Sequence, residues 1–364
     1  MVSDVNPVRL LEDAVRIESH ESVGRMRDFL LENIDEAEPH DSGCVVARKG
    51  RENEGRHVIL NTHMDVVPPH IEFKREDEII KGRGACDAKA SLVAMSIAFS
   101  RVTPKSGKVT LVISPDEETV SQGLYEYVSA ELDPLDYDDH KNNMAIVGEP
   151  TGLDLCTAAR GRFELVVEFE GVASHAARPE SGRNAISCAA EAIKRLASLE
   201  PMEDALLGES TLTVTKIDGG EASNQVPERA CFTVDRRSVP PETQEDFLKK
   251  VEDELEDIGC NVNVVFADRP TPFLEAFRTD PDEYVVSELL RTVEEVRGSE
   301  PDIRPFDAAT EASYLAQYMP VVVFGPGLIS DGDKPIAHSE REFVRVEEFR
   351  DATEILTRFL ERTV

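Results

Sequence analysis

The segment AKASLVAMSIAFSRVTPKSGKVTLVIS, residues 88–114, contains two apolar runs of different character. The first run, AKASLVAMSIAFS, is long enough for a helix and apolar on every face, so it predicts a helix buried on all sides. The second run, KVTLVIS, is shorter and rich in β-branched residues, which predicts a buried strand. A buried helix followed by a buried strand is the building unit of an α/β sheet with parallel strands.

The same alternation extends in both directions along the chain. Strands are predicted at 43–49, 57–62, 144–148 and 320–325, and helices at 8–17, 123–132, 310–319 and 346–363. The first helix has a clear start, because Asn6 suits the N-cap and Pro7 the first helical position. The predicted fold class is therefore α/β, with a mostly parallel sheet flanked by helices.

The middle of the chain follows a different order. Between residues 161 and 267 the pattern reads strand, helix, strand, strand, helix, strand, which is the order of a ferredoxin-like unit. Its strands alternate apolar and polar residues, so one face of this sheet is exposed or covered by a partner. We expect an inserted α+β domain at 160–270, within a domain formed by 1–159 and 271–364.

The charge of the chain is extreme, since 72 acidic and 40 basic residues give a formal net charge of −32. Such a charge argues against nucleic acid or an anionic membrane as a partner. The acids are spread along the whole chain, and only about a dozen of the basic residues are Lys. This pattern indicates a halophilic source, where salt screens the repulsion between like charges.

A halophilic protein of this charge is expected to unfold in dilute buffer, where the repulsion between its acidic side chains is unscreened. KCl is expected to stabilise it, because salt screens this repulsion. Thermal unfolding measured over a series of KCl concentrations checks this expectation. Equal unfolding temperatures in dilute buffer and in concentrated KCl would contradict it.

The six cysteines, at positions 44, 86, 156, 188, 231 and 260, are scattered and form no CxxC pair. We expect reduced thiols, as in the cytoplasm, rather than a disulfide framework or a cysteine zinc site. Residues 1–10 lack the charged start and apolar core of a signal peptide, and no apolar run reaches membrane-spanning length. A cytoplasmic location is predicted.

Titratable side chains follow the predicted strands at the points where those strands end. They are His63 and Asp65, the triplet Asp116-Glu117-Glu118, and Glu149, with Asp87 in the loop before the buried helix and His338 in a loop after the last strand. The carboxyl ends of parallel strands meet at one edge of the sheet. Imidazole and carboxylate ligands without thiolate suit Zn²⁺, Co²⁺ or Mn²⁺. The sequence therefore predicts a metal site at this edge.

The positions of these residues suggest how they divide the work. Asp65 can accept the second ring N–H of His63 and fix its tautomer, and Asp87 is placed to bridge two metal ions. Glu117 and Glu118 point to opposite sides of an extended segment, so one can bind metal while the other faces a water molecule. In so acidic a chain the triplet alone would be unremarkable.

The motifs NTHMDVVP, GRGACDAKAS, SPDEET, VGEPT, GVASHAARPESGRNAI, VDRRSVP, FGPG and AHSERE occur in this order over nearly the whole chain. Together they resemble the M20 family of dinuclear zinc metallopeptidases and deacylases, which includes acetylornithine deacetylase and succinyl-diaminopimelate desuccinylase. The resemblance implies a zinc-exopeptidase-like fold and a homodimer formed through the inserted domain. It also implies two zinc ions per subunit, with Co²⁺ or Mn²⁺ as substitutes.

The resemblance assigns roles at the metal centre. One zinc ion would be held by His63, Asp87 and Glu149, and the other by Asp87, Glu118 and His338. Glu117 would be the general base. Asp65 is expected to orient His63, and we assign Asp116 only a supporting role.

The resemblance also assigns substrate contacts. His175 of a partner subunit would help to bind the oxyanion, and Arg237 would hold the substrate carboxylate. Asn224, Gly325 and Gly327 would lie against the substrate. Three positions depart from the family pattern: Ala90 replaces the usual Gly, Ala88 replaces the common Met, and Glu311 replaces the Asp of a TDA motif.

The expected reaction is metal-dependent hydrolysis of an amide bond in a small N-acyl amino acid of the N-acetylornithine or N-succinyl-diaminopimelate type. A carboxypeptidase or dipeptidase with the same ligands is the alternative. A non-catalytic metal- or solute-binding protein is a more distant one, because it would not need Glu117. A dinucleotide-binding oxidoreductase is disfavoured, since GRGACD lacks the GxGxxG pattern and does not directly follow a strand.

Overall fold

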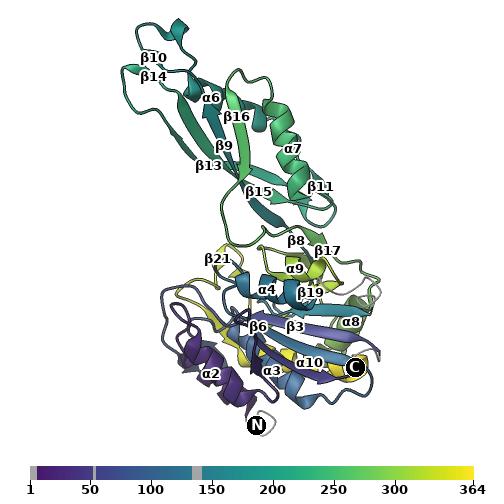
Figure 1. The fold of residues 1–364 in the computed structure, drawn as a ribbon. Coiled ribbons are helices and arrows are strands. Elements are labelled where there is room, and N and C mark those ends of the chain that lie inside the picture. Colours follow the sequence, from purple (N-terminus) through teal and green to yellow (C-terminus); the bar gives the residue numbers. More distant parts are fainter. Residues whose placement is uncertain (1–5, 52–54, 133–141) are drawn as a thin grey trace. The chain divides into compact units, whose positions relative to one another are not determined.

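The computed structural model describes residues 6–51, 55–132 and 142–364, and the chain divides into two compact units (Figure 1). The first unit comprises Met1–Ala158 and Arg278–Val364, and the second comprises Ala159–Phe277. Within the described residues, no helix combines the length and the apolar character that crossing a membrane requires.

The first unit is built on a nine-stranded sheet whose main path is β1-β2-β6-β3-β7-β19-β8-β17, with β18 paired to β8. The strands are β1 (Glu38–Pro39), β2 (Val45–Gly50), β3 (His57–His63), β6 (Lys108–Ser114), β7 (Asn143–Val147), β8 (Leu155–Ala159), β17 (Phe277–Arg278), β18 (Ile303–Phe306) and β19 (Val321–Val323). The central strands β6, β3, β7 and β19 run parallel. This confirms the predicted α/β class, while β2 and β8 add antiparallel flanks.

Helices cover both faces of this sheet. They are α1 (Pro7–Arg16), α2 (Gly24–Asn33), α3 (Lys89–Arg101), α4 (Gln122–Glu131), α8 (Tyr284–Arg297), α9 (Ala312–Ala316) and α10 (Val346–Thr363). The central helix α3 packs against β3, β6, α1 and α10, which explains why residues 89–99 are all buried. Helices α4 and α9 contact each other and lie over the opposite face (Figure 1).

Two helix boundaries can be compared with expectation. The Asn6 side chain accepts a hydrogen bond from the Val8 amide at 3.0 Å, so the predicted start of α1 is confirmed. The helix predicted at 310–319 is wrong in length, because α9 covers only Ala312–Ala316. Residues 317–319 turn directly into the short buried strand β19, which leaves no room for another helical turn.

A small three-stranded sheet joins two distant parts of the first unit. Its strands are β4 (Lys74–Glu76), β5 (Ile79–Lys81) and β22 (Phe343–Arg345), and β22 pairs antiparallel with β5. Val344 lies opposite Ile80. The pairing therefore brings the segment that follows His338 beside the loop that carries Asp87.

The second unit contains a four-stranded antiparallel sheet in the order β13-β15-β9-β16. Its main elements are β9 (Gly161–Glu170), α6 (Ala185–Leu196), β13 (Thr211–Gly219), β15 (Arg229–Ser238), α7 (Gln244–Leu255) and β16 (Asn261–Phe266). Short pairs β10 (Ser174–His175) with β14 (Gln225–Val226), and β11 (Glu203–Asp204) with β12 (Gly208–Glu209), flank it, and a 3₁₀ turn covers Pro179–Ser181. The strand and helix order is that of a ferredoxin-like unit.

Helices cover one face of this second sheet, and β13 and β16 form its two edges. Helices α6 and α7 pack on the face that contributes Phe163 and Phe232 to the core. Strand β13 ends the sheet, and its Ile217 is 59% exposed. An exposed edge strand offers unpaired backbone groups to a further strand.

The expectation that all cysteines are reduced is wrong for one pair. Cys188 on α6 and Cys260, directly before β16, form a disulfide, and their Cα atoms are 6.2 Å apart. The two residues are separated by 72 positions and meet only because α6 and β16 belong to the same small unit. The four remaining cysteines are free.

Candidate metal-dependent active site

Two groups of three side chains come together where the parallel strands of the first unit end. One group is His63, Asp87 and Glu149, and the other is Asp87, Glu118 and His338. In each group the candidate ligand atoms lie within 4.8 Å of one another. Asp87 belongs to both groups, as a carboxylate that bridges two cations must.

His63 is the last residue of β3 and is buried, and its two ring nitrogens have different partners. Nδ1 lies 3.1 Å from the Asp65 backbone oxygen and 3.2 Å from Asp65 Oδ1. Nε2 lies 3.3 Å from Asp87 Oδ1 and 3.9 Å from a Glu149 carboxylate oxygen. With Nδ1–H donating to Asp65, Nε2 is the nitrogen left to act as a ligand.

Asp65 also fixes the segment that follows β6. Its Oδ1 accepts a hydrogen bond from the Glu117 amide at 3.1 Å, and its Oδ2 accepts one from the Glu118 amide at 3.0 Å. One buried carboxylate therefore orients His63 and the backbone of both glutamates. This second contact was not foreseen from the sequence, because it involves backbone amides.

Asp116, the first acid of the triplet, has a different task. Its two carboxylate oxygens accept hydrogen bonds from the amides of Gln122 and Gly123, at 2.8 and 2.9 Å. These amides lie at the start of α4 and have no partner within the helix. Asp116 therefore caps α4 and belongs to neither ligand group.

His338 reaches the shared carboxylate from the other side. Its Nε2 lies 3.2 Å from Asp87 Oδ2 and 3.0 Å from Glu118 Oε1. Hydrogen bonds with Asp87 and then with Glu118 raise the pKa of His338 to about 10. Burial alone would raise the pKa of Asp87, but its hydrogen bonds with His338 and His63 hold that pKa below its usual value.

The residues of this site fit a pair of cations. Burial, followed by the charge of Glu149, raises the pKa of Glu117 well above its usual range. Burial likewise raises the pKa of Glu149, with Asp87 adding to the effect against the opposing charge of His63. These carboxylates are crowded and short of positive charge, which bound metal ions would supply.

Residues 59–362 match the sequence model of peptidase family M20/M25/M40. The chain belongs to this family. It is 31% identical over 357 residues to an uncharacterised metallohydrolase of Methanocaldococcus jannaschii, covering 94% of both chains. It is 30% identical over 336 residues to an acetylornithine deacetylase of Myxococcus xanthus, covering 86% of this chain and 82% of the relative.

A solved structure shares the fold. The aminopeptidase PepT of Bacillus cereus superposes with a TM-score of 0.76 at 19% identity, over 99% of each chain. As an M20 metallohydrolase, this chain is an enzyme that uses metal to hydrolyse an amide or peptide bond. The predicted family is thereby confirmed.

Gly325 and Gly327 of this M20 enzyme lie beside Glu149 and the Asp87 loop. A Cβ atom at position 325 would lie 2.2 Å from Ser91 Oγ and 2.6 Å from the Glu149 backbone oxygen. Gly327 has a φ of +88°, and a Cβ there would lie 2.5 Å from Cys86 Cβ. Close packing therefore requires glycine at both positions. Their predicted contact with substrate stays a prediction.

The other predicted substrate contacts belong to the second unit. His175 on β10 and Asn224 are neighbours, since the Asn224 carbonyl accepts a hydrogen bond from the Ala176 amide at 2.9 Å. Arg237 lies on β15, where its Nε donates to Asp235 Oδ1 at 2.8 Å. His175 and Asn224 are exposed and Arg237 is half-buried.

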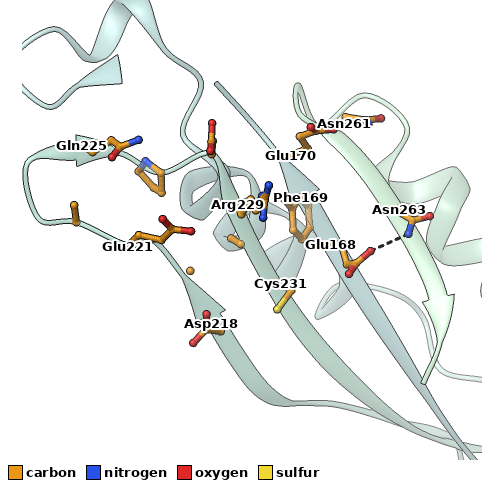
Figure 2. A pocket seen from close by; sticks show the side chains of 16 residues that line it. Glu168, Phe169, Glu170, Asp218, Glu221, Gln225, Arg229, Cys231, Asn261 and Asn263 are labelled. Atoms are coloured by element: carbon orange, nitrogen blue, oxygen red, sulfur yellow. Dashed lines mark hydrogen bonds between the residues drawn. The ribbon is translucent and has the colours of Figure 1, made fainter. Parts of the chain in front are cut away.

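A hollow of about 500 Å³ also lies in the second unit, at one end of its sheet (Figure 2). Its lining is acidic and includes Glu168, Glu170 and Asp218, with Arg229 as the only cation among the described residues that line it. Glu168 accepts a hydrogen bond from Asn263 at 2.9 Å. No histidine lines the hollow, and neither metal-ligand group belongs to it.

Glu311 is a buried acid that the sequence left without a clear role. Its Oε1 accepts hydrogen bonds from Ser114 Oγ at 2.5 Å and from Asn61 Nδ2 at 3.1 Å. The hydroxyl of neighbouring Thr310 donates to Glu149 Oε1 at 3.3 Å. Glu311 therefore connects β3 with the end of β6, and Thr310 holds the Glu149 carboxylate. Its replacement of the family's TDA motif was the only signal in the sequence.

Proposed function

We propose that this M20 enzyme hydrolyses the amide bond of a small N-acyl amino acid, of the N-acetylornithine or N-succinyl-diaminopimelate type, and releases the free amino acid. The observation that carries the proposal is the pair of ligand groups sharing Asp87, with Glu117 in neither group but within electrostatic reach of Glu149, His63 and Glu118. The similarity to an acetylornithine deacetylase supports this choice of substrate class.

We propose zinc as the natural metal, with Co²⁺ or Mn²⁺ as substitutes. His63, Asp87 and Glu149 would hold one ion, and Asp87, Glu118 and His338 the other. A mixed set of imidazole and carboxylate ligands without thiolate suits these metals. When bound, the metal pair polarises the scissile carbonyl and makes water acidic enough to lose a proton near neutral pH.

The chain's own residues would move the protons. Glu117 takes the proton of the attacking water and later delivers it to the nitrogen of the leaving amine. Its position is fixed because the Glu117 amide is bound to Asp65, which also orients His63. Water attack and amine departure can then use the same carboxyl group.

The second unit would supply the contacts to substrate. The Nδ1 atom of His175 accepts a hydrogen bond from the Ala177 amide at 3.1 Å, so a neutral ring carries its proton on Nε2. From Nε2, His175 would donate a hydrogen bond to the developing oxyanion. Arg237 would bind the α-carboxylate of the amino acid, and Asn224 would lie against the substrate beside His175.

We further propose that a second copy of the chain pairs along β13, and that His175 acts in the site of this partner. The exposed edge of β13 and the exposed Ile217 support this interface. Ile186 on α6, which packs against β13, is also exposed, at 41%.

The substrate class is tested by a hydrolysis screen. N-acetylornithine, N-succinyl-diaminopimelate, N-acetylmethionine and simple dipeptides are each incubated with metal-stripped protein, with and without Zn²⁺ or Co²⁺. We expect turnover of an N-acyl amino acid only when metal is added. Turnover restricted to dipeptides would favour the peptidase alternative, and no turnover of any compound with metal bound would contradict the proposed reaction.

A further inference from the structure

A buried ion pair lies beside the metal-ligand groups but belongs to neither. Glu342 and Arg83 are 1% and 2% exposed, and Glu342 Oε2 accepts a hydrogen bond from Arg83 Nη1 at 2.5 Å. Arg83 Nε also donates to the Pro69 carbonyl at 3.2 Å. The pair thus connects the segment after β3, the loop before α3 and the segment before β22.

The second carboxylate oxygen of Glu342 points at the backbone of the shared ligand. Oε1 accepts hydrogen bonds from the amides of Cys86 and Asp87, both at 3.3 Å, and lies 3.7 Å from Cys86 Sγ. Each oxygen of this carboxylate therefore has its own task. One neutralises Arg83, and the other holds the two residues that place the Asp87 side chain.

The position of Glu342 in the chain lets it connect two loops. It follows His338 by four residues and directly precedes β22, which pairs with β5. The Glu342 backbone carbonyl accepts a hydrogen bond from the Gly82 amide at 3.3 Å. Glu342 consequently joins the loop that carries His338 to the loop that carries Asp87, the two loops whose ligands meet in the second group.

Stability alone gives a weak reason for such a pair. Taking two charges out of water is costly, and apolar residues of similar size often replace a buried ion pair without loss of stability. A carboxylate that accepts hydrogen bonds from the loop of a metal ligand can also orient that ligand, because hydrogen-bond partners of metal ligands set their orientation.

We infer that Glu342 is a positioning residue for Asp87: its Oε1 fixes the Cys86–Asp87 backbone so that the Asp87 carboxylate can serve both metal ions. This inference rests on the two-metal centre proposed above. Arg83 contributes by keeping the Glu342 carboxylate in place.

Two double variants separate the hydrogen bonds from the ion pair. Both contain Arg83→Met, so neither has the buried charge pair. R83M/E342Q keeps an oxygen that can accept from the two amides, whereas R83M/E342M fills the space without an acceptor. Co²⁺ binding to each metal-stripped protein is followed by the visible absorption of the ion, and thermal unfolding of the metal-free proteins is measured alongside.

We expect R83M/E342M to bind Co²⁺ about 10- to 100-fold more weakly than R83M/E342Q, the range found when partners of metal ligands are removed. In the metal-free R83M/E342M protein the Cys86 and Asp87 amides lose their acceptor, whereas R83M/E342Q buries an unpaired side-chain NH₂ group, so the two metal-free proteins are expected to differ little in unfolding temperature. A purely structural role predicts that Co²⁺ affinity and spectrum do not differ between the two variants, and that result would overturn the inference.

Failure of the proposed metal centre gives a different result, because the wild-type protein would then bind no Co²⁺ tightly. If either double variant does not fold, Glu342→Asp replaces the comparison. Its carboxylate keeps a negative charge beside Arg83 but is one methylene shorter and loses its reach to the amides. Weaker Co²⁺ binding by this variant supports the inference, and wild-type binding overturns it.

Discussion

Glu117→Gln is expected to lower kcat by about three orders of magnitude, because a group that accepts and donates a proton contributes roughly 10²- to 10⁴-fold to a rate. Gln has nearly the same size as Glu but cannot take the proton of the attacking water. Glu117 belongs to neither ligand group, so both metal ions should bind as in the wild type. Steady-state kinetics and metal analysis of the same preparation check both parts.

The neighbouring acid provides a matched control for this variant. Asp116→Asn removes a charge from the same segment but keeps an oxygen that can cap α4. Its kcat should stay close to that of the wild type. If Glu117→Gln also retains near-normal kcat with two metals bound, Glu117 is not the base. If Asp116→Asn falls equally far, the effect comes from the charge of the segment.

His175→Ala is expected to lower kcat by about 10²- to 10³-fold, the usual effect of removing one donor to an oxyanion. His175 is exposed, so the substitution should leave the second unit folded, and the Ala177 amide that bonds to Nδ1 can then bond to water. Because the donor acts in the transition state, kcat should fall far more than KM changes. Kinetics with the substrate found in the screen measure the two separately.

Action of His175 in the partner's site makes a sharper prediction. A heterodimer of His175→Ala with Glu117→Gln has one site that contains both an intact Glu117 and an intact His175. Two affinity tags allow this heterodimer to be purified from co-expressed chains. It should recover about half of the wild-type activity, since one of two symmetric sites is complete. A heterodimer as inactive as its parents would show that His175 does not cross to a partner.

The sheet of the first unit could be predicted because its strands and helices each carry a strong local pattern. KVTLVIS and HVILNT are continuous apolar runs, which is what strands covered on both faces require. The antiparallel flanks could not be predicted in this way. The buried end of β2 is as apolar as the neighbouring parallel strands. Its composition therefore does not show that β2 runs antiparallel to β6.

The candidate ligand residues could be found because each follows a strand or lies in a recognisable motif. The structure brings all five together around Asp87. Glu342 ends the AHSERE motif and Glu311 replaces the Asp of the TDA motif, but the motifs did not show what these acids contact, since their partners Arg83 and Asn61 are distant in sequence. In a chain with 72 acids, one more carboxylate gives no signal until its burial is known.

The disulfide was missed for a related reason. Pairing of Cys188 with Cys260 depends on the packing of α6 beside the start of β16. The spacing of the two cysteines does not encode that contact. The pairing of cysteines cannot be deduced from sequence alone.

The place of β19 in its sheet has a consequence for the nascent chain. In the sheet, β19 lies between β7 and β8, parallel to β7 and antiparallel to β8. In the sequence, both of these strands begin before the second unit and β19 comes after it. During translation β7 and β8 therefore emerge without the strand that joins them. The second unit, which is continuous in sequence, can fold on the ribosome first, because domains generally fold as units during synthesis. The sheet of the first unit is completed only afterwards, when β19 has been synthesised.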